Sequence, residues 1–415
     1  MPLFSCDSIP AINADRLWAR HMEMAAIGPV NTTGSCRLAL TPEDAAARDL
    51  FARWCMEARM EVRSDRAGNM FARRQGRDAA RPAVASGSHL DTQPHGGRFD
   101  WVSGVLAALE VVETLNDAAI ETVAPLMVIN WTNEEGVRFA PGMLGSAWFA
   151  GRIEDEQLDA TMSTDGRRFA DEAEAIGWRG SASRQELPMD AFFELHIEQG
   201  PVLEACGAAV GIVTRVQGLC WLDARVTGSD AHAGTTPFCA RRDALLAAAS
   251  MLVGVNDVGR AEGSDARVSV GRLRTATDGP STVVGRAEFV IDIRHPDAAV
   301  LKRLSERCRQ TCEELAHRYG CEIEVFERFL VQPTMFAEDC IGVLEDAAKA
   351  SQVPYRKMAS GALHDAANIA LLVPSAMIFI PCRNGISHNV AEYASKEHLA
   401  AGCNVLLRAM LARAS

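Results

Sequence analysis

The stretch Ala83-Val-Ala-Ser-Gly-Ser-His89-Leu-Asp91-Thr92 joins a strand-like run of small and apolar residues to a histidine and a carboxylate. From Pro82 onward, strand-like and helical patterns alternate along the chain. Val102 to Leu115 has the apolar spacing of a helix, and Leu126 to Trp131 is typical of a buried strand. This alternation predicts an α/β fold, in which ligands gather beyond the ends of the strands.

Three further segments, far apart in the chain, also carry a histidine or carboxylate that a metal ion could use. They are Asn133-Glu134-Glu135-Gly136, Glu194-Leu-His196-Ile-Glu198 and Ile386-Ser-His388-Asn389. The first two follow or end apolar runs, so folding could bring these side chains to one rim of a sheet. Because the chain has only ten histidines, their recurrence in this setting predicts a metallohydrolase.

Each segment has a simpler explanation when taken alone. Glu134 and Glu135 could be two solvated acids in an exposed turn. Asp100, which ends a glycine-rich turn just before a helix, could be a plain N-cap. His196 could be an ordinary core histidine. The four segments taken together favour the metal site over these alternatives.

The chemistry assigns a different task to each acid. Adjacent carboxylates beside a buried strand need a cation or a proton to offset their charge, so one glutamate would bind metal and the other would carry a proton. Asp100 could bridge two ions with its two oxygens. Asp91 lies two positions after His89, a spacing that lets its carboxylate accept the second ring N–H of a metal-binding histidine.

Length and composition bound the remaining possibilities. A chain of 415 residues with 48% hydrophobic residues is too long for one ordinary core, so we expect two domains. The net charge of −12 argues against nucleic-acid or acidic-membrane partners. The apolar stretches Pro125–Trp131 and Leu371–Ile380 are too short to span a membrane, and Met1–Cys6 does not resemble a secretory signal. We therefore expect a cytoplasmic protein that binds small solutes.

The pattern changes between Gln217 and Val331 to the order βαββαβ, which is that of a ferredoxin-like unit. The predicted elements are strand 219–228, helix 241–254, strand 267–274, strand 286–295, helix 297–318 and strand 321–331. Because α/β character returns after Pro333, we expect a discontinuous catalytic domain, residues 1–216 with 333–415, interrupted by an inserted domain, residues 217–332.

The motifs together resemble the hydantoinase/carbamoylase amidohydrolases, a group within the aminoacylase-like metallopeptidases that includes N-carbamoyl-L-amino-acid hydrolases, allantoate amidohydrolases and bacterial β-ureidopropionases. The resemblance covers nearly the whole chain in order. The motifs that carry it are Gly87-Ser-His-Leu-Asp-Thr92, Gly96-Gly-Arg-Phe-Asp100, Asn133-Glu-Glu-Gly136, Glu194-Leu-His-Ile-Glu-Gln-Gly200, His232-Ala-Gly-Thr-Thr-Pro237, Asp292-Ile-Arg-His295 and Asn384-Gly-Ile-Ser-His-Asn389.

The resemblance implies a dimetal aminopeptidase-like catalytic domain, a mixed sheet flanked by helices, with an inserted domain that serves as lid and dimerisation unit. It implies two divalent ions, zinc first, with manganese, cobalt or nickel as alternatives. His89, Asp100 and His196 would hold one ion, and Asp100, Glu135 and His388 the other. Glu134 would be the general base.

The resemblance also implies the substrate contacts. Arg294 would bind the substrate carboxylate through its guanidinium fork, with Gln217 as a weaker contact. The alternative for Arg294 is an exposed ion pair with Glu288 or Asp292. His232 would reach the active site of a partner subunit.

Three positions depart from the pattern of the family. Trp101 stands where glycine usually follows the bridging aspartate, and Ser281 stands where an asparagine is expected. In Gly361-Ala-Leu-His-Asp365, Leu363 replaces a glycine before His364. Because these positions lie in segments that contact substrate in the family, we expect them to influence specificity.

The resulting expectation is an amidohydrolase that cleaves the ureido C–N bond of an N-carbamoyl-L-amino acid to the amino acid, carbon dioxide and ammonia. Allantoate amidohydrolase or β-ureidopropionase activity is the nearest alternative. More distant are N-acyl-amino-acid hydrolysis, dipeptidase activity, or a metal-dead binding protein. We expect a small ureido acid as ligand and a homodimer formed through the inserted domain.

Overall fold

The computed structural model describes residues 9–415. The Met1–Cys6 segment, where we predict no secretory signal, lies outside these residues. The chain forms two compact units, one made of Met1–Thr214 with Met335–Ser415 and the other of Arg215–Thr334. The second unit contains all of residues 217–332, in which the sequence predicts an insertion.

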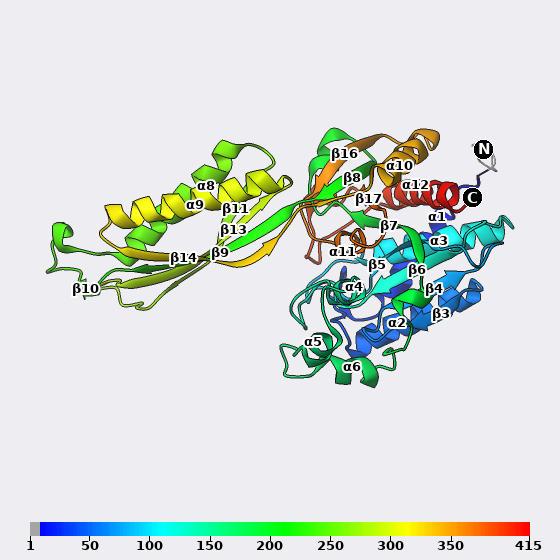
Figure 1. The fold of residues 1–415 in the computed structure, drawn as a ribbon, viewed down its shortest axis with the longest axis horizontal. Coiled ribbons are helices and arrows are strands. Elements are labelled where there is room, and N and C mark those ends of the chain that lie inside the picture. The colour runs from blue at the N-terminus through cyan, green and yellow to red at the C-terminus, as the bar shows by residue number, and fades with distance from the viewer. Residues whose placement is uncertain (1–8) are drawn as a thin grey trace. The chain divides into compact units, whose positions relative to one another are not determined.

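A mixed sheet runs through the larger unit in the order β15-β8-β17-β7-β5-β6-β4-β3, with β16 paired to β8 (Figure 1). Its strands are β3 (Glu61–Ser64), β4 (Met70–Arg74), β5 (Ala83–His89), β6 (Leu126–Trp131), β7 (Met189–Ile197), β8 (Val210–Val216), β15 (Thr334–Met335), β16 (Tyr355–Ser360) and β17 (Ser375–Ile380). The α/β class predicted from the sequence is confirmed.

Four adjacent strands at the centre of this sheet, β17, β7, β5 and β6, are parallel. Every residue of β5, β6 and β17 is buried, as in a sheet covered on both faces. Because the four strands run the same way, their carboxyl ends meet at one edge of the sheet. Residues that follow these strands are therefore neighbours in space.

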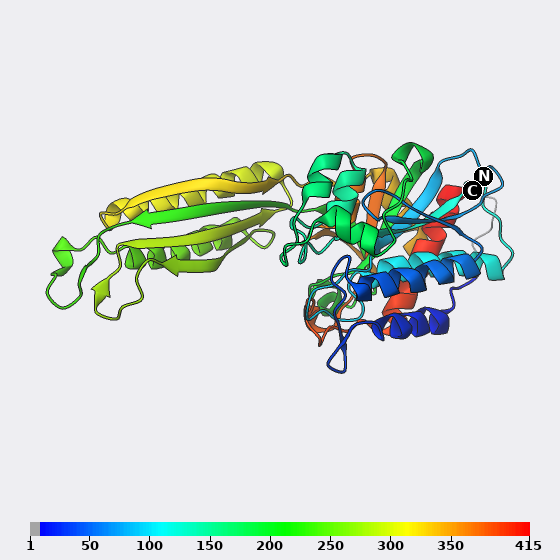
Figure 2. The same cartoon turned by 90° about the horizontal axis from the view of Figure 1, so that it is seen from below.

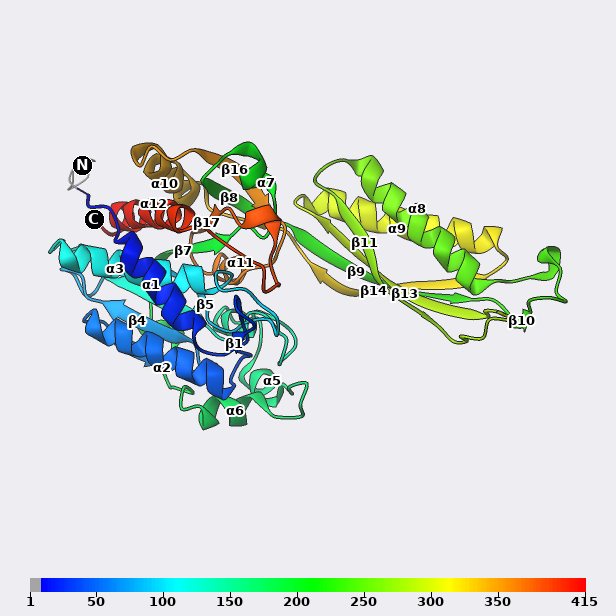
Figure 3. The same cartoon turned by 180° about the vertical axis from the view of Figure 1, so that it is seen from behind.

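Helices pack against this sheet and against one another. α3 (Val102–Asp117) packs on β5, and α12 (Lys396–Ala414) packs on β7 and β17. α1 (Ala14–Ala25) lies beside both helices, as Figure 3 shows. The other α-helices and strands of this unit are β1 (Pro29–Val30), β2 (Gly34–Ser35), α2 (Pro42–Glu57), α4 (Leu144–Phe149), α5 (Asp155–Ala160), α6 (Phe169–Ala175), α7 (Val202–Cys206), α10 (Glu338–Ala350) and α11 (Asp365–Ile369).

The smaller unit is a four-stranded antiparallel sheet in the order β11-β13-β9-β14, with two helices on one face (Figures 1 and 2). Its elements are β9 (Gly218–Thr227), α8 (Ala244–Glu262), β11 (Arg267–Thr275), β13 (Arg286–His295), α9 (Ala298–Arg318) and β14 (Glu322–Val331). A short pair, β10 (Ala231–His232) with β12 (Thr282–Val283), lies outside this sheet. Helix α8 begins later and ends later than the predicted 241–254.

Helix α8 is long and apolar enough to cross a membrane by length and composition, with a mean hydropathy of 1.2. With 19 residues, α8 is longer than Pro125–Trp131 and Leu371–Ile380, the two apolar stretches whose lengths the sequence analysis compared with that of a membrane span. Met251 and Val255 are buried in the core of the smaller unit, whereas Leu246 and Val253 are 48% and 64% exposed. These features are those of a core helix with one uncovered apolar face.

Close packing of α3 on the sheet gives a test of the fold. A β-carbon on Gly104 would lie 2.4 Å from the Leu195 carbonyl oxygen, whereas one on Gly342 in α10 would meet nothing within 4 Å. We expect Gly104→Ala to destabilise the protein by about 1–3 kcal/mol through overpacking. Gly342→Ala should stabilise it by about 0.5–1 kcal/mol through helix propensity. Urea unfolding measures both, and a gain at Gly104 would contradict this packing.

Candidate metal centre

The parallel strands bring the predicted metal ligands to one edge of the sheet. His89 is the last residue of β5, and His196 lies next to the last residue of β7. Glu134 and Glu135 follow β6, and His388 lies in the loop after β17. The side chains of His89 and His196 are almost completely buried, whereas that of His388 is 48% exposed. Four segments far apart in sequence thus meet in one cluster.

Asp100 lies between two of these histidines. Its Oδ1 is 3.1 Å from Nε2 of His196, and its Oδ2 is 3.6 Å from Nε2 of His388. The same nitrogen of His388 is 3.8 Å from Oε2 of Glu135. Because the two oxygens of one carboxylate face different imidazoles, Asp100 has the placement of a ligand that bridges two ions.

Main-chain carbonyls determine which ring nitrogen each histidine presents. Nδ1 of His89 donates to the Asp91 carbonyl at 3.1 Å, and Nδ1 of His196 donates to the Ile197 carbonyl at 2.9 Å. A carbonyl oxygen only accepts, so Nδ1 carries the proton and Nε2 carries the lone pair. Both histidines therefore present the nitrogen that can bind a metal ion.

Asp91 acts differently from the sequence prediction. Its main-chain carbonyl, rather than its carboxylate, makes the hydrogen bond to His89, because the carboxylate lies farther away, at 3.5 Å. The carboxylate instead accepts the main-chain N–H groups of Glu134 and Glu135, each at 3.2 Å. Asp91 therefore holds the turn that carries both glutamates.

The donor set and its electrostatics fit divalent cations. Burial, with the nearby charges of Asp365 and Glu135, raises the pKa of Glu134 well above its usual value. Burial and the charge of Asp100 likewise raise the pKa of Glu135, whose Oε1 is buried without a hydrogen-bond partner. Cations offset such repulsion, and carboxylate and imidazole groups suit zinc and its neighbours.

The two glutamates occupy different places in the cluster. Oε2 of Glu134 is 3.4 Å from Nε2 of His89. Glu135 lies on the side of His388, and its Oε2 accepts a hydrogen bond from the Gln93 amide at 2.5 Å. Glu135 is therefore held on the side of His388, among the predicted ligands, and Glu134 lies beside His89.

Some supporting residues were missed by the sequence analysis. Oε1 of Glu392 accepts the main-chain N–H groups of Phe99 and Asp100, at 3.0 and 2.8 Å. The Gln199 amide donates to Oδ2 of Asp100 at 2.8 Å, and Ser387 donates to the same oxygen. Glu392 follows His388 by only four positions, but nothing in that spacing indicates that its carboxylate accepts main-chain N–H groups.

Trp101 adopts a conformation that is unusual for a bulky residue. Its φ of 62° and ψ of −63° form a γ-turn closed by the Val102 N–H, which donates to the Asp100 carbonyl at 2.6 Å. The helix thus begins after Trp101, and Asp100 is not its N-cap. The indole is buried, with its ring centroid 6.1 Å from that of His89 and 6.3 Å from that of His388.

A buried polar cluster lies behind His196. Glu194, His196 and His364 each place a possible ligand atom within 4.8 Å of the others. The carboxylate of Glu194 accepts the Ser88 hydroxyl and the Ala366 N–H, each at 2.9 Å. His364, predicted as a substrate contact, is only 1% exposed, so here it supports His196 rather than lining an open surface. Its neighbour Leu363 is partly buried.

The other predicted substrate contacts lie in the smaller unit. Arg294 points away from the core, as predicted, and binds Asp292 through Nε at 2.9 Å and Nη2 at 3.0 Å. The alternative ion pair is therefore present with Asp292, whereas Glu288 binds Arg225 and Arg286. Gln217 is buried at the start of this unit.

His232 lies in a loop whose main chain determines how the ring is presented. Its Nδ1 accepts the N–H groups of Gly234 and Thr235, at 3.1 and 3.2 Å. The Ser281 carbonyl accepts the Ala233 N–H at 2.8 Å, so Ser281 lies beside this loop. With Nδ1 acting as an acceptor, the neutral ring carries its proton on Nε2.

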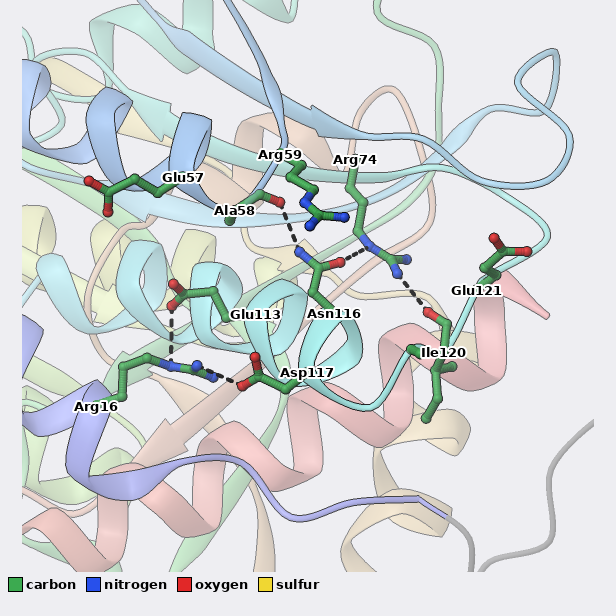
Figure 4. Close-up of a pocket in the computed structure, with 11 residues that line it drawn as sticks. Arg16, Glu57, Ala58, Arg59, Arg74, Glu113, Asn116, Asp117, Ile120 and Glu121 are labelled. Atoms are coloured by element: carbon green, nitrogen blue, oxygen red, sulfur yellow. Dashed lines mark hydrogen bonds and ion pairs between the residues drawn. The ribbon is translucent and has the colours of Figure 1, made fainter.

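A surface pocket of about 450 Å³ lies away from the histidine cluster, between α2, α3 and α1 (Figure 4). Two of its arginines, Arg16 and Arg74, are bound to other residues of the lining. Arg16 donates to Asp117 at 2.7 Å, and Arg74 donates to the Asn116 side chain and the Ile120 carbonyl. The lining contains no histidine, so the pocket lacks the chemistry of the cluster.

Comparison with known proteins agrees with this geometry. Residues 85–412 match the model of peptidase family M20/M25/M40. The chain belongs to this family, in its hydantoinase/carbamoylase group. It is 43% identical to an N-carbamoyl-L-amino-acid amidohydrolase from Rhizobium meliloti, with 96% of each chain covered.

Two further relatives broaden the comparison. The crystal structure of a hydantoinase/carbamoylase family amidase from Burkholderia multivorans is 44% identical, with a TM-score of 0.94 over 98% of this chain and 99% of that one. A ureidoglycolate hydrolase from Oryza sativa subsp. japonica is 33% identical over 96% of this chain and 84% of its own.

The crowded carboxylates predict how metal removal affects stability. A raised carboxyl pKa means that the folded state keeps protons which the unfolded state has lost, so stability falls as pH rises above about 4.3. We expect the thermal stability of chelator-treated protein to fall as the pH rises above about 4.3, and that of metal-loaded protein to fall much less. In metal-free Glu135→Gln, which removes one repelling charge, the decline should be shallower. If thermal stability declined equally steeply with pH in the presence and absence of metal, this account would be contradicted.

Proposed function

We propose that this M20-family protein is a metal-dependent amidohydrolase that hydrolyses N-carbamoyl-L-amino acids to the amino acid, carbon dioxide and ammonia. The observation that carries this proposal is the placement of Asp100 between His196 and His388, with Glu134 beside His89. The amidohydrolase relatives support the substrate class.

Two divalent ions are proposed as cofactors. His89, Asp100 and His196 would hold one ion, and Asp100, Glu135 and His388 the other, with zinc preferred over manganese, cobalt and nickel. Such ions, when bound, lower the pKa of water and polarise a carbonyl group. The orientation of Nε2 on His89 and His196 supports this assignment.

Glu134 is proposed as the group that moves the proton. Its carboxylate would take a proton from the attacking water and deliver it to the nitrogen that leaves when the ureido C–N bond breaks. The remaining carbamate would then decompose to carbon dioxide and the second amine. The main-chain bonds from the Glu134 turn to Asp91 support this role, because they hold the carboxylate in place.

Arg294 is proposed to bind the substrate carboxylate, with Gln217 as a further contact. Ser281 and Leu363 would shape the space for the substrate side chain, and Trp101 would act through the ligand histidines that it contacts. Allantoate, β-ureidopropionate and ureidoglycolate-type acids are the alternative substrates. The ureidoglycolate hydrolase relative supports including the last of these.

A cytoplasmic homodimer is the proposed form of the protein, without nucleic-acid or membrane partners. The uncovered apolar face of α8, including Leu246 and Val253, supports dimerisation through the smaller unit. His232 would act in the partner's active site. A neutral ring that carries its proton on Nε2 would donate a hydrogen bond to the developing oxyanion of the substrate.

Ammonia release by metal-loaded protein tests this function. We expect N-carbamoyl-L-amino acids to be hydrolysed, in a panel with β-ureidopropionate, allantoate, ureidoglycolate and N-acetyl-amino acids. Glu134→Gln should retain both metals and lose about 10²–10⁴-fold in kcat, because only the proton carrier is removed. Metal content measured alongside is the control. An inactive wild-type protein with two bound metals, or a fully active variant, would contradict the proposal.

Mixed dimers test the action of His232 in the partner subunit. Neither His232→Ala nor Glu134→Gln protein alone should be active. After subunit exchange, half of the dimers are mixed, and each contains one complete site if His232 acts in trans. We therefore expect recovery of about a quarter of wild-type activity. If exchange is confirmed by tagged subunits and no activity returns, His232 does not act in trans.

A further inference from the structure

Arg294 lies in an arrangement of side chains that runs across three strands of the smaller unit. Asp292 and Arg294 are two residues apart on β13 and share the face of the sheet opposite the helices. Asp292 forms two parallel hydrogen bonds with the guanidinium of Arg294, through Nε at 2.9 Å and Nη2 at 3.0 Å. This bidentate contact defines the plane of the guanidinium.

Asp292 is itself held from the neighbouring strand. Trp221 lies directly opposite Asp292 in the β9–β13 register, and its indole Nε1 donates to Oδ2 of Asp292 at 2.9 Å. On the other side, Phe329 of β14 lies opposite Trp221, and the two ring centroids are 5.5 Å apart. The indole is thus supported by an aromatic ring on one side and bound to a carboxylate on the other.

Other ion pairs on the same face are built differently. Asp223 binds Arg328 and lies 3.6 Å from Arg272, so its carboxylate is shared between two exposed arginines. Glu288 is likewise shared between Arg225 and Arg286. Within residues 9–415, Asp292 is the carboxylate on this face that an indole N–H also binds. This additional hydrogen bond indicates that Asp292 has a role beyond neutralising the charge of a surface arginine.

We propose that Trp221 and Asp292 are positioning residues that orient the Arg294 guanidinium before a carboxylate-bearing substrate arrives. This inference rests on the proposed function, in which Arg294 binds the substrate carboxylate. An arginine side chain has many rotamers, and binding is weakened when the ligand must order them. Prior orientation by Asp292 removes part of that loss, and Trp221 acts on Arg294 through its hydrogen bond to Asp292.

Two effects of Asp292 oppose each other, and their sizes decide the design of the test. Its negative charge repels a substrate carboxylate, whereas its geometry orients the arginine. The side chains of Asp292 and Arg294 are 23% and 31% exposed, so solvent screens the repulsion and the orientation should dominate. Trp221→Phe removes the N–H without changing charge, so it isolates the orienting effect.

The experiment measures ligand affinity in metal-loaded Glu134→Gln protein, in which turnover does not interfere. The probes are N-carbamoyl-L-amino acids and their carboxamides, titrated by calorimetry. We expect Trp221→Phe to raise Kd for the acids by about 3- to 10-fold and to leave Kd for the carboxamides unchanged. Asp223→Asn, which disrupts an ion pair on the same face, is the matched control and should change neither.

A double-mutant cycle separates positioning from a general structural role. In an Arg294→Lys background, Trp221→Phe should have almost no further effect, because the indole acts through the guanidinium. Additive effects, or an equal loss for acids and carboxamides, would overturn the inference. Thermal unfolding checks that each variant folds. If Trp221→Phe does not fold, Asp292→Asn replaces it, with the same selective loss for the acids expected.

Failure of the proposed function can be told apart from failure of this inference. The proposed function is contradicted if wild-type protein releases no ammonia from any ureido acid, and the binding data of the variants do not change that conclusion. The inference fails if the Glu134→Gln parent binds no acid, or binds acids with the same Kd after Trp221→Phe. A selective loss for acids supports positioning even if turnover is found on another member of the panel.

Discussion

Burial of several carboxylates at the edge of a parallel sheet is the constraint on which the rest of the structure depends. Glu134 and Glu135 lie beside Asp100, and burial together with the charges of neighbouring carboxylates raises the pKa of both glutamates, which disfavours the ionised form that could bind metal. Main-chain N–H groups are donated to Asp91 and Glu392, which fixes the two turns that carry the acids.

In the proposed function, this arrangement would separate metal binding by Glu135 from proton transfer by Glu134. Glu135 is held by the Gln93 amide on the side of His388, whereas Glu134 faces His89. Glu134 and Glu135 are adjacent and chemically identical, but the turn places their carboxylates beside different residues. The turn follows a fully buried strand, β6, and its main chain is bound to Asp91, so both ends of the contact are anchored in the folded core.

The sequence was sufficient to predict which segments meet, because parallel strands end at one edge and each ligand follows or ends such a strand. It could not predict contacts made by the main chain. Asp91 was expected to bind His89 through its carboxylate, but a carbonyl does so, and that acceptor has no sequence signal. Glu392 was missed for the same reason. Helix α8 continues beyond the predicted end at residue 254 to Glu262, through Asn256, Asp257 and Gly259, whose low helix propensity gives no sign of a continuing helix.

Trp101 shows how strain and function are linked in this centre. A γ-turn with positive φ is unfavourable for a tryptophan, and it persists only where the surroundings determine it. Here Glu392 binds the N–H groups of Phe99 and Asp100, which fixes the chain just before the turn. A β-carbon on Gly96 would lie 2.4 Å from the indole, so the preceding loop has room for the ring only because glycine stands there. Asp100 therefore takes its orientation from a segment that Glu392 holds directly before a strained residue.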